Sequence, residues 1–244
     1  MKSFFLTLVT AAFLTVLCSC SDAPGKPVPN DVPIVPNEIS DFNVLYRENC
    51  AGCHGSEGRG GAAIALGDPV YLAIADDTVL RRAATNGIRG TSMPAFAQSA
   101  GGMLTEKQID VIVRGIRERW SKPDTLRGAN PPPYSSATPG DVSRGSEVYA
   151  TFCSSCHGSA GRGGSKASSI IDGSFLALLS DQELRTLVIV GRPELDAPDW
   201  RSNVPGKPMS AQDVSDVVAW LASQRSKFPG RPYPSAANTT GEVR

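Results

Sequence analysis

The chain has 244 residues, with 24 basic and 24 acidic side chains and a formal net charge of zero. This balance argues against nucleic-acid binding, which requires a surplus of basic residues. Glycine (24 residues) and proline (19) are abundant, and aromatic residues make up only 7%. A short segment of this composition has a small core and needs a further source of apolar bulk.

The N-terminus predicts an export signal. Lys2 precedes an apolar run from Phe4 to Leu17, which is typical of a signal peptide. The run ends in Leu-Cys-Ser-Cys and resembles a bacterial lipoprotein signal, which implies removal of residues 1–19 and a lipid on Cys20. An uncleaved membrane anchor is the alternative, but a span needs about 20 apolar residues. Either interpretation places the bulk of the chain outside the cytoplasm.

The rest of the chain is predicted to form two small domains with flexible connections. Residues 20–37 and 121–140 are rich in proline and polar residues, which indicates a membrane tether and a linker. The domains are expected at residues 38–120 and 141–225. Residues 226–244 are expected to form a tail.

The two domains are a tandem repeat. Cys-Ala-Gly-Cys-His at residues 50–54 recurs as Cys-Ser-Ser-Cys-His at residues 153–157, an offset of 103 residues. Just before the last predicted helix the offset has grown to 105 residues, so Leu104 of the first copy aligns with Met209 of the second. Each copy is therefore expected to fold as one lobe of a two-lobed protein.

Both lobes predict helices and show no strand alternation, which indicates an all-α fold. Thr105-x-x-Gln108 and Ser180-x-x-Glu183 resemble capping boxes at helix starts. A further helix is expected to start at Ser210. Apolar residues at helical spacing are Phe42, Leu45 and Tyr46; Ile109, Ile112, Val113, Ile116 and Trp120; Leu184, Leu187 and Val188; and Val214, Val217, Val218 and Leu221.

The Cys-x-x-Cys-His motifs predict covalent attachment of two haems c. In a helical turn, thiols at positions i and i+3 reach the two vinyl groups along one edge of the porphyrin, and a histidine at i+4 lies under the iron. Zinc would need further ligands, and the only other cysteines are Cys18, in the predicted signal, and Cys20, the predicted lipidation site. The predicted haem-binding residues are Cys50, Cys53, His54, Cys153, Cys156 and His157.

A second axial ligand must come from outside the motifs, because the chain has only two histidines and both are used. Methionine is the usual alternative and raises the haem potential. Met93 is the candidate in lobe 1, since the following Pro94 stiffens its loop. Met103, which flanks a helix start, is expected to be a packing or surface residue.

Each lobe resembles a class I c-type cytochrome. Lobe 1 matches through CAGCHG, the glycine-rich loop, NGIRGTSMPAF and its last helix, and lobe 2 through CSSCHG, VGRPELDAPDW and its own last helix. The resemblance implies electron transfer, with His54 and Met93 as the axial ligands of haem 1. It also implies a backbone carbonyl bonded to the other histidine nitrogen. The family often has proline near the positions of Ile64 and Ser168, and neither residue is proline here, so this carbonyl cannot be assigned from the sequence.

Lobe 2 departs from the family at the second axial ligand, because Ala197 stands where lobe 1 has Met93. Three alternatives follow for haem 2. Its iron is open or water-bound, Met209 binds it, or Lys207 or Lys166 binds it. Met209 can equally be a core residue, since its repeat partner is a leucine.

We therefore expect a dihaem cytochrome c, anchored by lipid on the periplasmic side of a bacterial membrane. It would relay single electrons between redox proteins, such as a membrane respiratory complex and an oxidase or soluble acceptor. The alternative is a peroxidase-like enzyme or a CO- or NO-binding protein that uses haem 2. Against an enzyme, no distal histidine is available, and only Asp196 and Asp199 could act as acid–base groups there.

Overall fold

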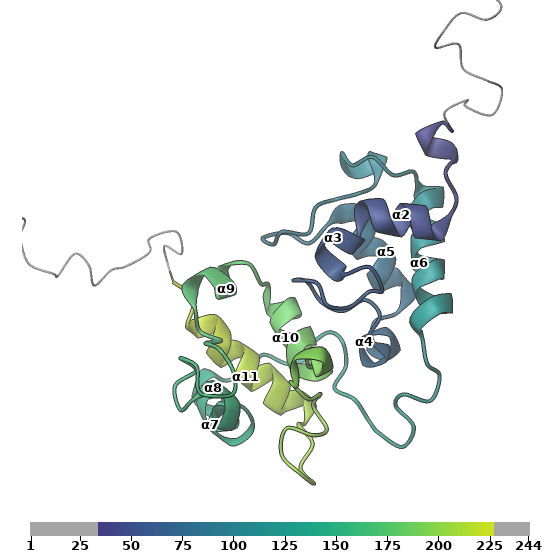
Figure 1. Ribbon diagram of the computed structural model, residues 1–244. Coiled ribbons are helices and arrows are strands. Elements are labelled where there is room, and N and C mark those ends of the chain that lie inside the picture. The colour runs from purple at the N-terminus through teal and green to yellow at the C-terminus, as the bar shows by residue number, and fades with distance from the viewer. Residues whose placement is uncertain (1–33, 227–244) are drawn as a thin grey trace, which may run out of the picture. The chain divides into compact units, whose positions relative to one another are not determined.

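The computed structural model describes residues 34–226 (Figure 1). The predicted signal peptide, Cys20, most of the tether and the tail from residue 227 lie outside the described residues. The short 3-10 helix η3 (Pro36–Glu38) belongs to a unit separate from the chain that begins at Ile39. Within residues 34–226 the chain is helical, with two isolated β-bridges and no strand, as the sequence predicts. None of the described helices is long and apolar enough to cross a membrane.

The two lobes repeat one order of α-helices, whereas their short 3-10 helices η4 and η5 lie on opposite sides of the aligned residues Met93 and Ala197. In lobe 1 these are α2 (Phe42–Asn49), α3 (Ala51–His54), α4 (Pro69–Ile74), α5 (Asp77–Asn86), η4 (Gln98–Ala100) and α6 (Glu106–Trp120). In lobe 2 they are α7 (Val142–Phe152), α8 (Ser154–His157), α9 (Gly173–Ala177), α10 (Asp181–Val190), η5 (Pro193–Leu195) and α11 (Ala211–Ser223).

The helix starts predicted from the sequence are confirmed. Thr105 and Gln108 form a capping box at α6, and Ser180 and Glu183 form one at α10. A third capping box, between Ser210 and Asp213, starts α11. Each box satisfies backbone N–H groups that the first helical turn would otherwise leave without a partner.

The core of each lobe lies where its first and last helices pack together. Figure 1 shows α2 beside α6, and α7 beside α11. The predicted apolar face of each last helix is buried there, and the predicted faces of α2 and α10 are buried in part. The buried residues of the last helices are Ile109, Ile112, Val113 and Ile116 in lobe 1, and Val214, Val217, Val218 and Leu221 in lobe 2.

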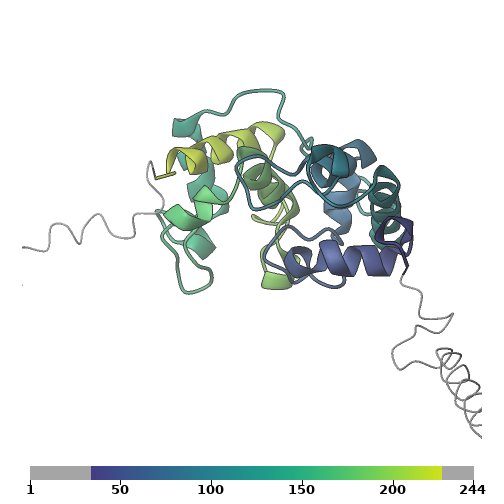
Figure 2. The same cartoon turned by 90° about the horizontal axis from the view of Figure 1, so that it is seen from above.

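The segment between α6 and α7 contains no helix or strand and runs as a loop (Figure 2). It is nevertheless held against lobe 2. Arg185 of α10, only 3% exposed, donates hydrogen bonds to the carbonyls of Pro133 and Tyr134 at 2.9–3.1 Å. Gln182 donates a further hydrogen bond to Tyr134 O at 2.8 Å.

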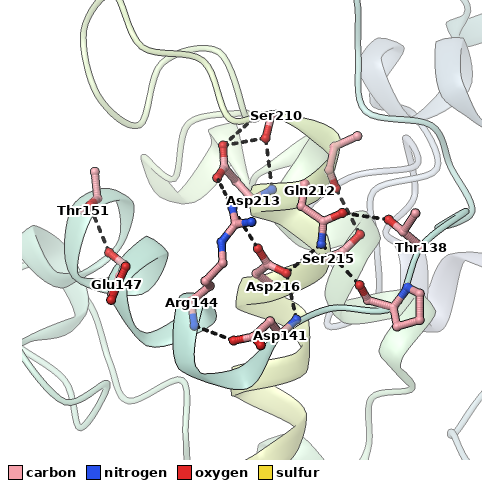
Figure 3. A network of polar contacts seen from close by, with 12 residues as sticks. Thr138, Asp141, Arg144, Glu147, Thr151, Ser210, Gln212, Asp213, Ser215 and Asp216 are labelled. Carbon is pink, nitrogen blue, oxygen red and sulfur yellow. Dashed lines mark hydrogen bonds and ion pairs between the residues drawn. The ribbon is translucent and has the colours of Figure 1, made fainter.

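A polar network joins the start of α7 to α11 (Figure 3). The Asp216 carboxylate is fully buried and accepts hydrogen bonds from the Asp141 backbone N–H and the Gln212 amide, each at 2.8 Å. Arg144 lies 3.2 Å from its other oxygen. A buried carboxylate requires such donors, so the network fixes how α7 meets α11.

Candidate haem-binding sites

Both Cys-x-x-Cys-His motifs form a single helical turn that follows a longer helix. In lobe 1 the N–H groups of Cys53 and His54 donate to Cys50 O at 3.2 and 3.0 Å. The equivalent bonds in lobe 2, to Cys153 O, have the same two lengths. The turn places the two thiols and the imidazole on neighbouring positions of one helical surface, as haem attachment requires.

The histidine of lobe 1 is fixed by a backbone carbonyl. His54 Nδ1 lies 2.7 Å from Ile64 O, and the side chain is only 6% exposed. Its other ring nitrogen, Nε2, is buried and has no hydrogen-bond partner. Burial lowers the pKa of His54 and so favours the neutral imidazole. A neutral imidazole with Nδ1 bonded to a carbonyl and Nε2 left free is the form that binds a metal.

Lobe 2 has the same histidine arrangement in a more open setting. His157 Nδ1 lies 2.9 Å from Ser168 O, and the side chain is partly exposed. The two positions that the sequence left unresolved, Ile64 and Ser168, thus supply the carbonyls themselves. A backbone carbonyl does not depend on the identity of its side chain, so proline is not needed for this contact.

A tyrosine of the preceding helix holds the end of each motif. Tyr46 Oη donates to Gly55 O at 3.0 Å, and Tyr149 Oη makes the equivalent bond to Gly158 O. Both glycines have positive φ angles, 83° and 78°, which an L side chain rarely adopts. The glycine after each histidine therefore allows the sharp turn that ends the motif.

The first thiol of each motif lies in an apolar setting. Burial, together with the neighbouring cysteine, raises the pKa of Cys50 and of Cys153 to about 12. All four motif cysteines are free of disulfides. Since a thioether carries no charge, bonding to a haem vinyl group suits these surroundings.

These features fit haem c. A buried polar atom without a partner calls for an explanation, and iron supplies one for His54 Nε2. The thiols, the oriented imidazoles and the carbonyl bonds match the donor set of a covalently attached haem.

The candidate methionine of lobe 1 lies in a short closed loop. Ile88 N–H donates to Met93 O at 3.0 Å, and Met93 N–H donates to Thr91 Oγ1 at 3.1 Å. The Met93 side chain is partly buried, whereas Met103 is 80% exposed. The loop is therefore ordered around Met93, and Met103 is the surface residue that the sequence suggests.

The corresponding loop of lobe 2 has the same length and closure. Arg192 N–H donates to Ala197 O at 2.9 Å, as Ile88 N–H does to Met93 O in lobe 1. Gly191 approaches the backbone of Ala197 as closely as Gly87 approaches that of Met93. The structure thus supports the sequence alignment of Ala197 with Met93.

Of the other ligand candidates of lobe 2, Met209 and Lys207 make contacts of their own. Met209 is 3% exposed and lies in the hydrophobic core. Lys207 Nζ lies 5.2 Å from the centre of the Phe152 ring. Lys166 is exposed and lies two residues before Ser168, the residue whose carbonyl faces His157.

The Ala197 loop also contacts lobe 1. Arg192 donates from Nη2 to Gly61 O at 3.0 Å and pairs with Glu194 at 2.5 Å. Gly61 lies in the glycine-rich loop that folds back on the motif near Cys53 O. Sequence reasoning gave no sign of this contact, because it joins residues 131 positions apart.

Each of the two lobes matches a known cytochrome c family. Residues 37–114 match the family of cbb3-type cytochrome c oxidase subunit III, and residues 142–225 match the cytochrome c family. The two matches overlap the two segments predicted as lobes.

Two curated relatives are subunits of a cytochrome c oxidase and of a cytochrome bc1 complex. The chain is 31% identical over 129 residues to the cbb3-type cytochrome c oxidase subunit CcoP of Azospirillum sp., covering 48% of this chain and 38% of that one. It is 22% identical over 191 residues to the cytochrome bc1 complex cytochrome c subunit of Mycobacterium bovis, covering 76% and 64%. It thus spans less than two thirds of either relative.

Among solved structures, a reducing HAO-like protein complex of Kuenenia stuttgartiensis aligns with 79% of this chain and 99% of the other, at 17% identity and a TM-score of 0.44. The assignment rests on the sequence matches and on the sites themselves. The chain is a c-type cytochrome with two cytochrome c domains in tandem. Each domain carries one covalently bound haem c, so the protein is a dihaem cytochrome.

Proposed function

We propose that this protein is an electron carrier that relays single electrons between redox proteins at the periplasmic side of a bacterial membrane. The observation that carries the proposal is the repeated motif turn, in which a backbone carbonyl orients each imidazole, at His54 and at His157. Bound haem supplies one-electron chemistry, and the chain supplies attachment and axial ligation. Relatives that are subunits of an oxidase and of a bc1 complex favour partners in respiratory complexes.

For haem 1 the proposed axial ligands are His54 and Met93, and for haem 2 the proposed proximal ligand is His157. The thiols of Cys50, Cys53, Cys153 and Cys156 form the thioether bonds. The closed loop between Ile88 and Met93 favours this assignment, because it limits the positions that the sulfur can adopt.

Replacement of Met93 tests this ligand assignment. Loss of a thioether ligand lowers the potential of a haem, so Met93→Ala should lower the midpoint potential of one of the two haems. Met103→Ala is the matched control, because Met103 is exposed and lies outside the Ile88–Met93 loop. A potentiometric titration in which Met93→Ala leaves both midpoints unchanged would refute Met93 as a ligand.

Electron relay itself is tested by stopped-flow mixing of the reduced protein with membranes that contain a terminal oxidase, and of the oxidised protein with a quinol-oxidising complex. We expect both haems to be oxidised in the first experiment and reduced in the second. If neither preparation exchanges electrons with the protein, the relay proposal fails.

An enzymatic role at haem 2 is the competing function. A peroxidase would consume hydrogen peroxide with many turnovers when a reduced cytochrome is the donor. The electron-carrier proposal expects no sustained turnover in this assay. Sustained turnover that is abolished by His157→Ala would favour the peroxidase instead.

The proposed location depends on Cys20. A lipid on this residue would hold the two lobes at the membrane surface through the proline-rich tether. Cys20→Ala is then expected to release a soluble holoprotein, and mass spectrometry of the wild-type N-terminal peptide should show a diacylglyceryl group. A wild-type peptide that begins at Met1 without a lipid would contradict the anchor.

A further inference from the structure

The second axial position of haem 2 is where the two lobes differ most in chemistry. Ala197 and Met93 occupy equivalent backbone positions in loops of equal length, each closed by one N–H bond to the carbonyl of that residue. An alanine methyl group cannot ligate iron. Lobe 2 therefore presents a short apolar side chain where lobe 1 presents a thioether.

Met209 is anchored as a core residue and not as a ligand. Its N–H donates to Trp200 O at 2.9 Å, just as Leu104 N–H donates to Phe96 O at 2.7 Å in lobe 1. Each of these residues directly precedes the N-cap of the last helix and is buried. Met209 thus fills the position of a leucine.

The side chain of Met209 has packing partners as well. Its sulfur lies 3.8 Å from Asn203 Nδ2, and the residue belongs to the buried core of its lobe. If the Met209 side chain left this place to ligate iron, it would leave a cavity in the core, which is costly.

The positions of the two lysines argue against ligation. Lys166 lies two residues before Ser168, whose carbonyl contacts His157, so this segment is on the histidine side of the haem site. The Lys207 ammonium group lies over the Phe152 ring, 5.2 Å from its centre. Ligation of iron by Lys207 would give up this cation–π contact.

We propose that haem 2 has no second protein ligand and that lobe 2 provides a binding site for a small exogenous ligand at this haem. The ligand class for the ferrous state is a neutral diatomic molecule, for which CO is the probe. This inference rests on the proposed attachment of haem to lobe 2. It deepens the proposed function because haem 1, with two protein ligands, would bind no exogenous ligand, whereas haem 2 would.

Titration of the dithionite-reduced full-length holoprotein with CO, followed by absorption spectroscopy, tests the proposal. Haem content is measured first by the pyridine haemochrome method. We expect two haems per chain and one bound CO per chain. Two haems with no CO binding would overturn this inference and leave the electron-carrier proposal intact. A single haem per chain would overturn this inference together with the dihaem assignment.

Three variants make the test specific. Ala197→Met should abolish CO binding and give haem 2 the spectrum of haem 1, because it restores the missing thioether. Met209→Leu should leave the stoichiometry at one CO per chain. Met93→Ala should raise it to two, by opening haem 1 in the same way.

The variants can also refute the proposal. If wild type binds no CO and Met209→Leu or Lys207→Ala binds one, then the replaced residue is the ligand of haem 2. If Ala197→Met is correctly folded by circular dichroism and still binds one CO, then residue 197 does not face the iron.

Discussion

The ring of Phe42 in α2 lies directly against Gly115 in α6, at a place where any side chain on residue 115 would overlap the ring. Lobe 2 has the opposite arrangement. Gly145 in α7 faces the Asp216 backbone and the Trp220 side chain of α11. The repeat offsets of 103 and 105 residues pair Phe42 with Gly145 and Gly115 with Trp220. In both lobes the first and last helices therefore cross at a contact between an aromatic residue and a glycine. The aromatic residue is on the first helix in lobe 1 and on the last helix in lobe 2.

This exchange predicts unequal effects of adding a methyl group at the two glycines. Gly145→Ala would push against backbone atoms of Asp216, which cannot move without displacing α11, whereas Gly115→Ala would push against the Phe42 side chain. We expect a loss of about 1–3 kcal/mol for Gly145→Ala and a smaller loss for Gly115→Ala. Urea unfolding followed by circular dichroism measures both.

Gly173→Ala serves as the control for this comparison, because a methyl group at residue 173 would make only an ordinary contact. In addition, Phe42→Ala should reduce the stability loss of the Gly115→Ala variant, because it removes the ring that the new methyl group would overlap. If Gly145→Ala is as stable as wild type, then the close contact between Gly145 and α11 does not constrain the helix crossing.

The buried carboxylate of Asp68 predicts a pH dependence of stability. Asp68 caps α4 by accepting hydrogen bonds from Val70 and Tyr71 N–H, and burial raises its pKa above the ordinary 3.8. A raised pKa in the folded state means that the folded protein binds this proton more tightly, so its stabilising effect is present at low pH and is lost as the pH rises through the folded-state pKa.

Asp68→Asn keeps an oxygen acceptor for the cap and cannot ionise. We expect the unfolding free energy of this variant, relative to wild type, to increase from acidic to neutral pH. Asp76→Asn, at the exposed N-cap of α5, controls for the change to an amide. A relative free energy that falls over this range would show that the Asp68 charge is net favourable.

The buried guanidinium of Arg185 is expected to hold the linker, residues 121–140, against lobe 2. Burial lowers the pKa of Arg185, and its partners are neutral carbonyls of Pro133 and Tyr134 and the Ser215 hydroxyl. Arg185→Met removes these donors, and buried acceptors left without donors cost about 1–3 kcal/mol. Limited proteolysis with mass spectrometry should then show faster cleavage between residues 131 and 140.

Arg127→Met is the matched control for the linker experiment. Arg127 is exposed, lies in the same linker and forms an ion pair with the equally exposed Asp124 at 2.6 Å. Equal cleavage rates in Arg185→Met and Arg127→Met would mean that the linker is not held by Arg185.

The hydrogen bonds from Tyr46 and Tyr149 to the glycines after the two motifs predict similar losses of stability when either hydroxyl is removed. Tyr46→Phe and Tyr149→Phe each remove one hydroxyl that donates to a glycine carbonyl, at Gly55 and at Gly158. Each variant should lose about 1 kcal/mol of unfolding free energy. Because the two tyrosines have no shared partner, the losses should add in the double variant. A double variant no less stable than either single one would contradict two independent bonds.

Several elements were predictable from the sequence because local interactions decide them. The capping boxes at Thr105 and Ser180 act within one helical turn. The haem motifs combine three side chains within five residues, so their chemistry depends on one turn of helix and not on the rest of the fold. The replacement of Met93 by Ala197 also needed only the repeat alignment.

Other features could not be read from the sequence. The helices α4, α5 and α9 were not predicted individually. None of them starts with a full capping box, and α4 and α9 are also short. Residues 121–140 were expected to be a plain linker, but their contact with Arg185 depends on the burial of a charge by a helix some 50 positions away.

The sequence by itself predicted two attached haems, proposed His54 and His157 as the histidines beneath them, and showed that only one lobe offers a methionine in the expected loop. These conclusions follow from covalent chemistry and short-range spacing. The tertiary structure decided which carbonyls orient His54 and His157, that Met209 is a core residue, and how Phe42 and Gly115 fit together. Those contacts depend on backbone atoms, which carry no sequence signal, and on packing between distant helices, which only the folded chain defines.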